Sequence, residues 1–330
     1  MARLNGNGKS KRNLGLLLFV VLGLLALQVG PVFAKYPEKR IRLVVPFAPG
    51  RGTDLPARIM AKYANPFLDN KIYVENIAGA AGALGFRAGA TAKPDGYTIT
   101  MLATGISVSP HVGMTDFPRL DQFDAICVVA QDPAILAVKL DSRFKTLNEL
   151  IDFAKSHPNE VTMSTAGVGS INHLIIAALG YATKCQFKAI PYDGSTPAMV
   201  AAIGGHVDVG VSGTGGTLAY ITGGKLRSLV TLGAKRSKYL PEVKTAKEQG
   251  IDVEMYMWRG AAVPKNTPQG IKDMINAAFR KAAESEEYKK TMDDEGLEPI
   301  YLGPQEAQQW LKKVDDYHKM IADKTGLKVQ

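Results

Sequence analysis

The sequence predicts a two-lobed α/β protein. After a basic and apolar leader, short runs rich in β-branched residues alternate with segments of helical periodicity, as in stacked strand-helix-strand units. One such series precedes residue 133 and a second follows it. A chain of 330 residues is long enough for two domains with separate cores. The pattern therefore indicates two α/β lobes with mostly parallel sheets.

The first 34 residues have the pattern of a signal peptide. Four basic residues and no acidic residue precede an apolar run over residues 14–27, and Val32-Phe-Ala34 follows it. The run is shorter than the roughly 20 apolar residues that a membrane-spanning helix requires. We expect export and cleavage after Ala34, with an uncleaved membrane anchor as the alternative. Cleavage removes four basic residues and lowers the formal net charge from +9 to +5.

The remaining charge is mild, and its basic residues are scattered among acidic ones. A nucleic-acid-binding protein shows a clustered basic stripe instead, so we expect no nucleic-acid partner. Cys127 and Cys185 both lie in apolar sequence. They either pair in an oxidising compartment or remain buried free thiols, and both alternatives stay open.

The first series begins with the β-branched run IRLVVPF. A helix should follow, because its apolar residues recur on one face. Pro94-Asp-Gly96 is typical of a turn and precedes another strand. The predicted elements are strands over residues 41–47, 71–75 and 97–102 and a helix over 55–68.

The second series begins with a strand over residues 133–138. Thr146-Leu-Asn-Glu149 has the form of a capping box and opens a helix that ends before His157-Pro158. The following predicted elements are strands over 161–164, 187–191, 207–212 and 227–232 and helices over 171–179 and 197–203.

Two helices are predicted near the C-terminus. Thr267 should cap the first of them, with Pro268 at its first helical position. The apolar stripes of both helices should pack on the core. The stripes contain Ile271, Met274, Ile275, Ala278, Phe279 and Ala282 in one helix, and Trp310, Leu311, Val314, Tyr317 and Ile321 in the other.

Two glycine-rich loops, residues 46–54 and 164–173, each follow a strand and open a helix. Glycine lets backbone N–H groups approach a ligand, and the start of a helix favours an anion. A tight structural turn is the alternative for either loop alone, but two matched loops predict an anion clamp. Nucleotide sites fit poorly, because the chain contains no G-x-x-x-x-G-K-[ST] motif and residues 79–89 lack a G-x-G-x-x-G frame after a strand.

An ordered set of motifs along the chain resembles the Bug-type solute-binding proteins of tripartite tricarboxylate transporters. The matching motifs are Tyr36-Pro37, Val45-Pro-Phe-Ala-Pro-Gly50, Gly52-Thr-Asp54, Val74-Glu-Asn76, Gly79-Ala-Ala-Gly82, Pro94-Asp-Gly-Tyr-Thr98, Gly167-x-Gly-Ser170-x-x-His173, Pro191-Tyr192, Gly194-x-x-Pro197-Ala198, Gly205-x-Val-Asp208, Gly224-Lys-Leu-Arg227 and Pro264-x-x-Thr-Pro268. The resemblance implies a type II periplasmic-binding-protein fold, a Venus flytrap whose chain crosses the hinge twice. The first lobe would combine residues 35–132 and 258–330, and the second would contain residues 133–257.

The resemblance also implies that the two loops act as pincers on a ligand carboxylate. The residues carried over are Phe47, Ala48, Gly50, Gly52, Thr53, Asp54, Thr165, Gly167, Gly169, Ser170 and His173. For the distal end of the ligand we expect contacts with Thr104, Ser107, Tyr192, Gly194, Ser195, Ser212 and Trp258.

Arg51 departs from the family pattern, which has a glycine at this position. Its planar guanidinium is suited to a bidentate contact with a second carboxylate, and an arginine that points to solvent is the alternative. For His173, a neutral ring is expected near the start of its helix, either on the ligand or in a local contact. Asp54 is expected as a helix N-cap or a ligand contact.

The implied function is an extracytoplasmic solute-binding protein. It would deliver a small carboxylate, a di- or tricarboxylate or an aromatic acid, to membrane permease subunits, and we expect a monomer without cofactor or metal. A receptor that feeds a sensor kinase is the alternative, and a secreted hydrolase is a weaker one. The sequence has no G-x-S-x-G elbow, and its five histidines lack His or Cys partners at metal-ligand spacing.

Overall fold

The computed structural model describes residue 1, residues 36–50 and residues 52–329. The predicted leader, its cleavage site after Ala34, and Arg51 lie outside the described residues. The folded unit treated below is Lys39–Gln330. In the described part of the chain, no helix is both long and apolar enough to cross a membrane.

The first lobe is built on a sheet in which β1 runs parallel to β2 and β3, and β9 runs antiparallel to β3. Its strands are β1 (Ile41–Val45), β2 (Ile72–Asn76), β3 (Thr98–Ala103), β9 (Tyr256–Pro264), β10 (Pro299–Leu302) and the first part of β4 (Phe123–Lys139). Its helices are α2 (Asp54–Ala64), α3 (Ala83–Ala90), α8 (Gln269–Glu284), α9 (Glu286–Asp294) and α10 (Pro304–Thr325).

The second lobe is built on a sheet in which β5 runs parallel to β6 and β7, while β7 and β8 run antiparallel to the second part of β4. Its own strands are β5 (Thr162–Thr165), β6 (Lys188–Pro191), β7 (Val209–Gly213) and β8 (Leu226–Thr231). Its helices are α4 (Leu147–Ser156), α5 (Ile171–Thr183), α6 (Ser195–Gly204) and α7 (Thr214–Thr222).

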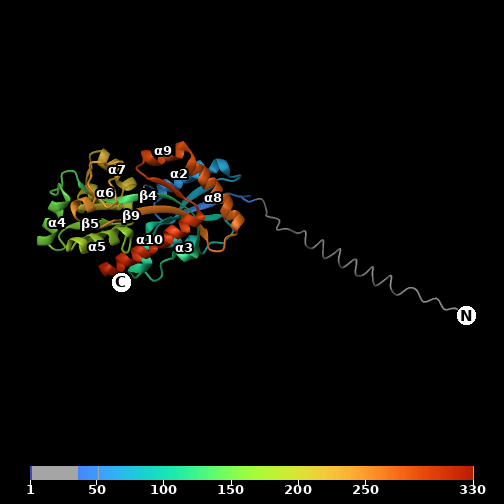
Figure 1. Ribbon diagram of the computed structural model, residues 1–330, viewed down its shortest axis with the longest axis horizontal. Coiled ribbons are helices and arrows are strands. Elements are labelled where there is room, and N and C mark those ends of the chain that lie inside the picture. Colours follow the sequence, from blue (N-terminus) through green and yellow to red (C-terminus); the bar gives the residue numbers. More distant parts are fainter. Residues whose placement is uncertain (2–35, 51, 330) are drawn as a thin grey trace. The chain divides into compact units, whose positions relative to one another are not determined.

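The strand β4 joins the two sheets, since it pairs with β9 up to Pro133 and with β7 from Ala134 onward. The chain returns to the first sheet before β9. Figure 1 shows β4 and β9 between the helices of the two lobes. This double connection is the hinge arrangement that the sequence predicted, and the lobe boundaries at residues 132/133 and 257/258 remain a proposal.

The prediction of mostly parallel sheets was wrong. Among the described strands, four pairings are parallel and five are antiparallel. All five antiparallel pairings involve β4 or β9, the two strands next to the hinge. The strands β4 and β9 do not belong to the strand-helix-strand series. No crossover helix connects either of them to a neighbouring strand that runs in the same direction.

The helix α4 begins and ends as predicted. Thr146 Oγ1 accepts a hydrogen bond from the Glu149 N–H at 3.2 Å, and the Glu149 carboxylate accepts one from the Lys145 N–H at 2.7 Å. The prediction for α8 was wrong in three details: Pro268 has extended backbone and occupies the N-cap position, Thr267 therefore does not cap the helix and donates to the Pro264 carbonyl instead, and Met274 is exposed. The remaining predicted strands and helices are present, with ends shifted by up to a few residues, except that the strand predicted over residues 133–138 is only the second part of β4.

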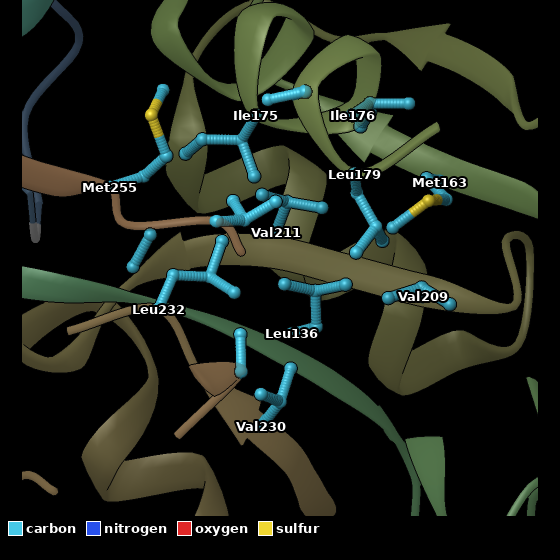
Figure 2. Close-up of a cluster of buried hydrophobic side chains, with 14 of the residues drawn as sticks. Leu136, Met163, Ile175, Ile176, Leu179, Val209, Val211, Val230, Leu232 and Met255 are labelled. Carbon is cyan, nitrogen blue, oxygen red and sulfur yellow. The ribbon is translucent and has the colours of Figure 1, made fainter. Parts of the chain in front are cut away.

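The two sheets have separate buried clusters, and the cluster of the second sheet also includes Val108, Val112 and Ala322 of the first lobe. Figure 2 shows the core of the second lobe, where Ile175 and Leu179 of α5 lie over Leu136 and Val211 of the sheet. The core of the first lobe lies between its sheet and the α10 stripe. Its larger members are Phe86, Leu102, Phe117, Phe123, Trp258 and Leu311. Cys127 and Cys185 are both buried free thiols.

Candidate functional site

A small cavity lies where strand ends and helix starts of both lobes meet. It encloses about 60 Å³, room for about four to six water centres at roughly 10–15 Å³ each. Its walls are Phe47, Ala48, Gly52, Thr53, Ala81, Ala103, Thr104, Gly105, Ala166, Ser170, Ile171, Asn172, Asp193, Gly194, Ser195, Thr196, Pro197, Met257, Trp258 and Arg259. A cavity of this size suits a small molecule.

Three helix starts contribute to the cavity wall. Gly52 and Thr53 precede α2, Ser170 precedes α5, and Gly194 precedes α6. The first N–H groups of a helix have no partner within the helix and carry the positive end of its dipole. Their convergence makes the cavity a site for an anion.

The first loop is fixed by Asp54, which is 2% exposed. Its Oδ2 accepts hydrogen bonds from Gly50 N and Arg58 Nε, both at 2.9 Å, and its Oδ1 accepts one from Asn76 Nδ2 at 2.8 Å. Asn76 Nδ2 also donates to the Phe47 carbonyl. Burial alone would raise the pKa of Asp54, but these hydrogen bonds and the charge of Arg58 leave the pKa below its ordinary value.

Asp54 therefore shapes the loop as a carboxylate and does not line the cavity. Its predicted role as an N-cap was wrong, because α2 begins at Asp54 itself and Thr53 occupies the N-cap position. The side chain reaches back to Gly50 instead of forward along the helix.

The second loop is held by hydrogen bonds within the loop and by one from the first lobe. Thr165 Oγ1 accepts a hydrogen bond from Gly167 N at 3.2 Å and lies 3.0 Å from the Gly167 carbonyl, to which it donates. Gly169 N donates to His173 Nδ1 at 3.3 Å, and the Gly169 carbonyl accepts from Ser109 Oγ of the first lobe at 3.0 Å. Among the described residues, the Ser170 hydroxyl has no hydrogen-bond partner.

His173 is held in its neutral form. Its Nδ1 accepts the Gly169 N–H, which places the ring proton on Nε2. Burial lowers the pKa of His173 below its ordinary value. The neutral ring that the sequence predicted is thus found in the local contact, and His173 does not line the cavity.

Three buried polar atoms on residues that line the cavity have no hydrogen-bond partner among the described residues. They are Ser170 Oγ, Asn172 Oδ1 and Trp258 Nε1. Buried polar groups are nearly always paired, by protein, by water or by a ligand. The hydroxyl of Ser170 and the indole N–H of Trp258 can each donate a hydrogen bond to a carboxylate oxygen.

The floor of the cavity comes from the end of β3 and the start of β9. Thr104 Oγ1 accepts a hydrogen bond from Trp258 N at 2.8 Å and thereby fixes the two strands at this point. Trp258 packs edge-on against Trp310, with ring centroids 5.7 Å apart. Arg259 follows on the same strand and is 5% exposed.

The structure brings together nine of the predicted ligand residues on the cavity wall: Phe47, Ala48, Gly52, Thr53, Thr104, Ser170, Gly194, Ser195 and Trp258. Gly167 and Tyr192 line a hollow that shares Phe47, Ala48 and Gly194 with the cavity. The predicted residues that line neither are Gly50, Asp54, Ser107, Thr165, Gly169, His173 and Ser212. Ser107 donates to the Thr104 carbonyl and contacts His318, so it supports the floor from behind.

Sequence reasoning missed Asn172, Thr196 and Arg259 on the cavity wall. Arg259 could have been identified as a candidate from the sequence, because a charged residue inside an apolar strand requires a partner or a function. Within the described residues, no group of three or more His, Cys, Asp or Glu side chains is arranged to hold a metal ion.

The model of the tripartite tricarboxylate transporter family receptor matches residues 57–327. The chain belongs to this family. A Cupriavidus necator family relative, the protein of the gbd 5'region, is 33% identical over 306 residues, which cover 93% of each chain. The structure of the periplasmic binding protein BugD has 29% identity and a TM-score of 0.84, and the match covers 89% of this chain and 100% of that one.

A further family structure is MatC from Rhodopseudomonas palustris, solved with bound malate. It has 26% identity and a TM-score of 0.80, and the match covers 87% of this chain and 99% of that one. The comparisons confirm the Bug-type solute-binding family and the two-lobed periplasmic-binding-protein fold that the sequence predicted. Membership of this receptor family implies a periplasmic location.

Proposed function

We propose that this receptor captures a small organic acid as its anion and delivers it to the permease subunits of a tripartite tricarboxylate transporter. The observation that carries the proposal is the buried Ser170 hydroxyl, which has no partner in the described part of the chain. It lies at the start of α5, on the wall of a cavity where α2 and α6 also begin. A carboxylate accepts both hydroxyl and backbone N–H hydrogens, so it matches this set of donors.

The energetics suit reversible capture. A micromolar dissociation constant corresponds to about −8.2 kcal/mol. Three or four charge-assisted hydrogen bonds contribute roughly 1.5–3 kcal/mol each, before the cost of ordering the ligand and the lobes is subtracted. The malate in MatC supports a carboxylate as the ligand class.

We assign the ligand contacts first to the nine predicted residues on the cavity wall. Arg51, outside the described residues, is retained as a proposed contact on sequence grounds. Gly50, Asp54, Thr165, Gly169 and His173 are proposed to act by shaping the two loops. Ser107 and Ser212 are proposed to support the floor and the second sheet.

Binding without catalysis is part of this proposal. Ser107 Oγ lies 3.0 Å from His318 Nδ1, but both residues are buried and do not line the cavity. Burial lowers the pKa of His318 to about 4, too low for an efficient general base near neutral pH. The contact therefore has a structural role, which favours a binding protein over a hydrolase.

Ligand binding can be tested by thermal shift against mono-, di- and tricarboxylates, including aromatic acids. At least one acid should raise the melting temperature. A flat panel combined with turnover of an ester or an amide would support the hydrolase instead. Delivery to a permease or to a sensor kinase is distinguished by measuring ligand uptake and kinase phosphorylation after deletion of the receptor gene.

The mature chain is proposed to begin after Ala34 and to act as a monomer. Intact-mass measurement of the exported protein should give a chain that starts at Lys35, and an uncleaved chain would show a membrane anchor. Light scattering of the purified protein measures its oligomeric state.

A further inference from the structure

The floor of the cavity contains a buried ion pair between the two strands of the hinge. Arg259 of β9 and Asp132 of β4 are 5% and 0% exposed, and Arg259 Nη1 donates to Asp132 Oδ1. In the β4–β9 register, Met257 lies opposite Asp132 and Arg259 opposite Ala130. Arg259 and Asp132 are therefore diagonal neighbours on one face of the sheet.

Asp132 is anchored from the second lobe. Its Oδ2 accepts a hydrogen bond from Gly215 N at 3.4 Å, in the first turn of α7. Gly213 leaves the necessary room, because a Cβ atom there would lie 2.0 Å from Asp132 Oδ2. Arg259 and the N–H groups at the start of α7 favour the charged form of Asp132, against a burial that raises its pKa.

Stability alone is a weak reason for such a pair. The free energy needed to desolvate two charges is about as large as the free energy gained from their attraction. Apolar side chains of similar volume stabilise a core equally well. The pair has a second use only if one of its members is available to another group, and Arg259 meets this condition because it lines the cavity while Asp132 does not.

Arg259 is the one Lys or Arg among the described residues on the cavity wall. A guanidinium has five N–H donors in a rigid fork. The bond to Asp132 fixes the fork through Nη1, which leaves donors for a ligand. The acidic Asp193 also lines the cavity, but it is exposed.

We propose that Arg259, oriented by Asp132, binds a second anionic group of the ligand and makes this receptor selective for short dicarboxylates over monocarboxylates. This inference rests on the proposed function, since it assumes that the helix starts hold the first carboxylate. It assigns to the buried Arg259 the role that the sequence suggested for Arg51.

The test is calorimetric titration with two matched pairs of ligands, succinate with butyrate and adipate with hexanoate. The wild-type protein should bind at least one diacid more tightly than its matched monoacid. Arg259→Gln should weaken that diacid by about tenfold or more and change the monoacid little. The selectivity ratio should therefore collapse towards one.

Two further variants guard against misfolding. Arg259→Gln leaves Asp132 buried without its partner, so the double variant Asp132→Asn with Arg259→Gln removes both charges and keeps polar side chains at both positions. It should fold and should show the same loss of selectivity. Arg236→Gln removes an arginine whose ion pair with Glu248 is exposed and lies away from the cavity, and it should leave the selectivity unchanged.

Three results would overturn the inference: a wild-type preference for monoacids, equal losses for both acids of a pair in the Arg259 variants, or selectivity that is lost in Arg51→Gly and kept in the Arg259 variants. Failure of the wild-type protein to bind any carboxylate would refute the proposed function itself, and is thus distinguishable from these outcomes.

Discussion

The two loops that frame the cavity are built differently. The loop before α2 is fixed by one buried carboxylate, since Asp54 binds Gly50, Arg58 and Asn76. The loop before α5 is fixed by hydrogen bonds within the loop and by one from Ser109, and it leaves the Ser170 hydroxyl without a partner among the described residues. The difference indicates a first loop that is preformed and a second loop whose polar groups are completed by the ligand.

The largest effect is expected at the first loop. Asp54→Ala removes three hydrogen bonds to a buried carboxylate and should lower the free energy of unfolding by about 3 kcal/mol, at about 1 kcal/mol per bond. It should also abolish ligand binding, because Gly50 and Asn76 lose their common acceptor. Urea unfolding and calorimetry measure the two effects.

Arg58→Gln is the matched control for Asp54→Ala. The Arg58 side chain is 49% exposed, so its ion pair with Asp54 is partly screened by solvent. A loss of stability as large as that of Asp54→Ala would show that the ion pair, and not the set of bonds, holds the loop.

The second loop can be tested at its contact with the first lobe. A Cβ atom on Gly169 would lie 2.6 Å from Met114 Sδ, and the φ of Gly169 is +74°. Gly169→Ala should weaken ligand binding by about tenfold or more, since the neighbouring Ser170 must move when the lobes close. Backbone strain alone should cost about 1 kcal/mol of stability.

The variant Gly250→Ala is a control that separates the effect of backbone strain from the effect of the contact between the lobes. Gly250 has nearly the same φ, +77°, but no heavy atom lies within 4 Å of the added Cβ position. It should lose the same stability and keep full ligand affinity. Equal affinity losses in both glycine variants would refute the closure contact.

Acid should weaken the second loop before the first. The folded-state pKa of His173 is lowered by burial, so the unfolded chain binds the proton more readily, and the stability that His173 provides is lost as the pH falls below about 6.5. The pKa of Asp54 is also lowered, so its contribution persists above about pH 3.8 and is lost as the pH falls through the folded value.

Urea unfolding of the wild type and of His173→Asn between pH 7 and pH 5 measures this difference. Asparagine keeps an acceptor for the Gly169 N–H but does not titrate, so this variant should lose less stability on acidification. His318 titrates over the same range in both proteins, because burial lowers its pKa to about 4, and its contribution cancels in the comparison. Identical pH dependence in the two proteins would exclude His173 as a contributor.

Much of the fold followed from local sequence. The capping box at Thr146 and the apolar stripe of α10 correctly predicted two helices, because each signal lies within the few residues that specify the helix. The first half of β4 and the strand β9 were missed. The Gly260-Ala-Ala262 run of β9 has low strand propensity, and the pairing of β4 with β9 is set by the hinge. The helix α7 was missed because it begins Thr-Gly-Gly, and these glycines are required for close packing against Leu297 and Ser212.

The candidate site was also predictable from the sequence only in part. Both glycine-rich loops and Trp258 were predicted from motif and resemblance, and they meet at one cavity. The pairing of Arg259 with Asp132 was not predictable, because the two residues are 127 positions apart and meet only through the antiparallel register of β4 and β9.

The smallest effect on stability, and the most direct test of anion capture at the helix starts, is expected for Ser170→Ala. Because the hydroxyl of Ser170 has no partner in the described part of the chain, its removal should change the free energy of unfolding by less than about 0.5 kcal/mol. Calorimetry with the tightest carboxylate of the thermal-shift panel should nevertheless show affinity reduced by about tenfold or more. Unchanged affinity in a stably folded Ser170→Ala protein would contradict the account.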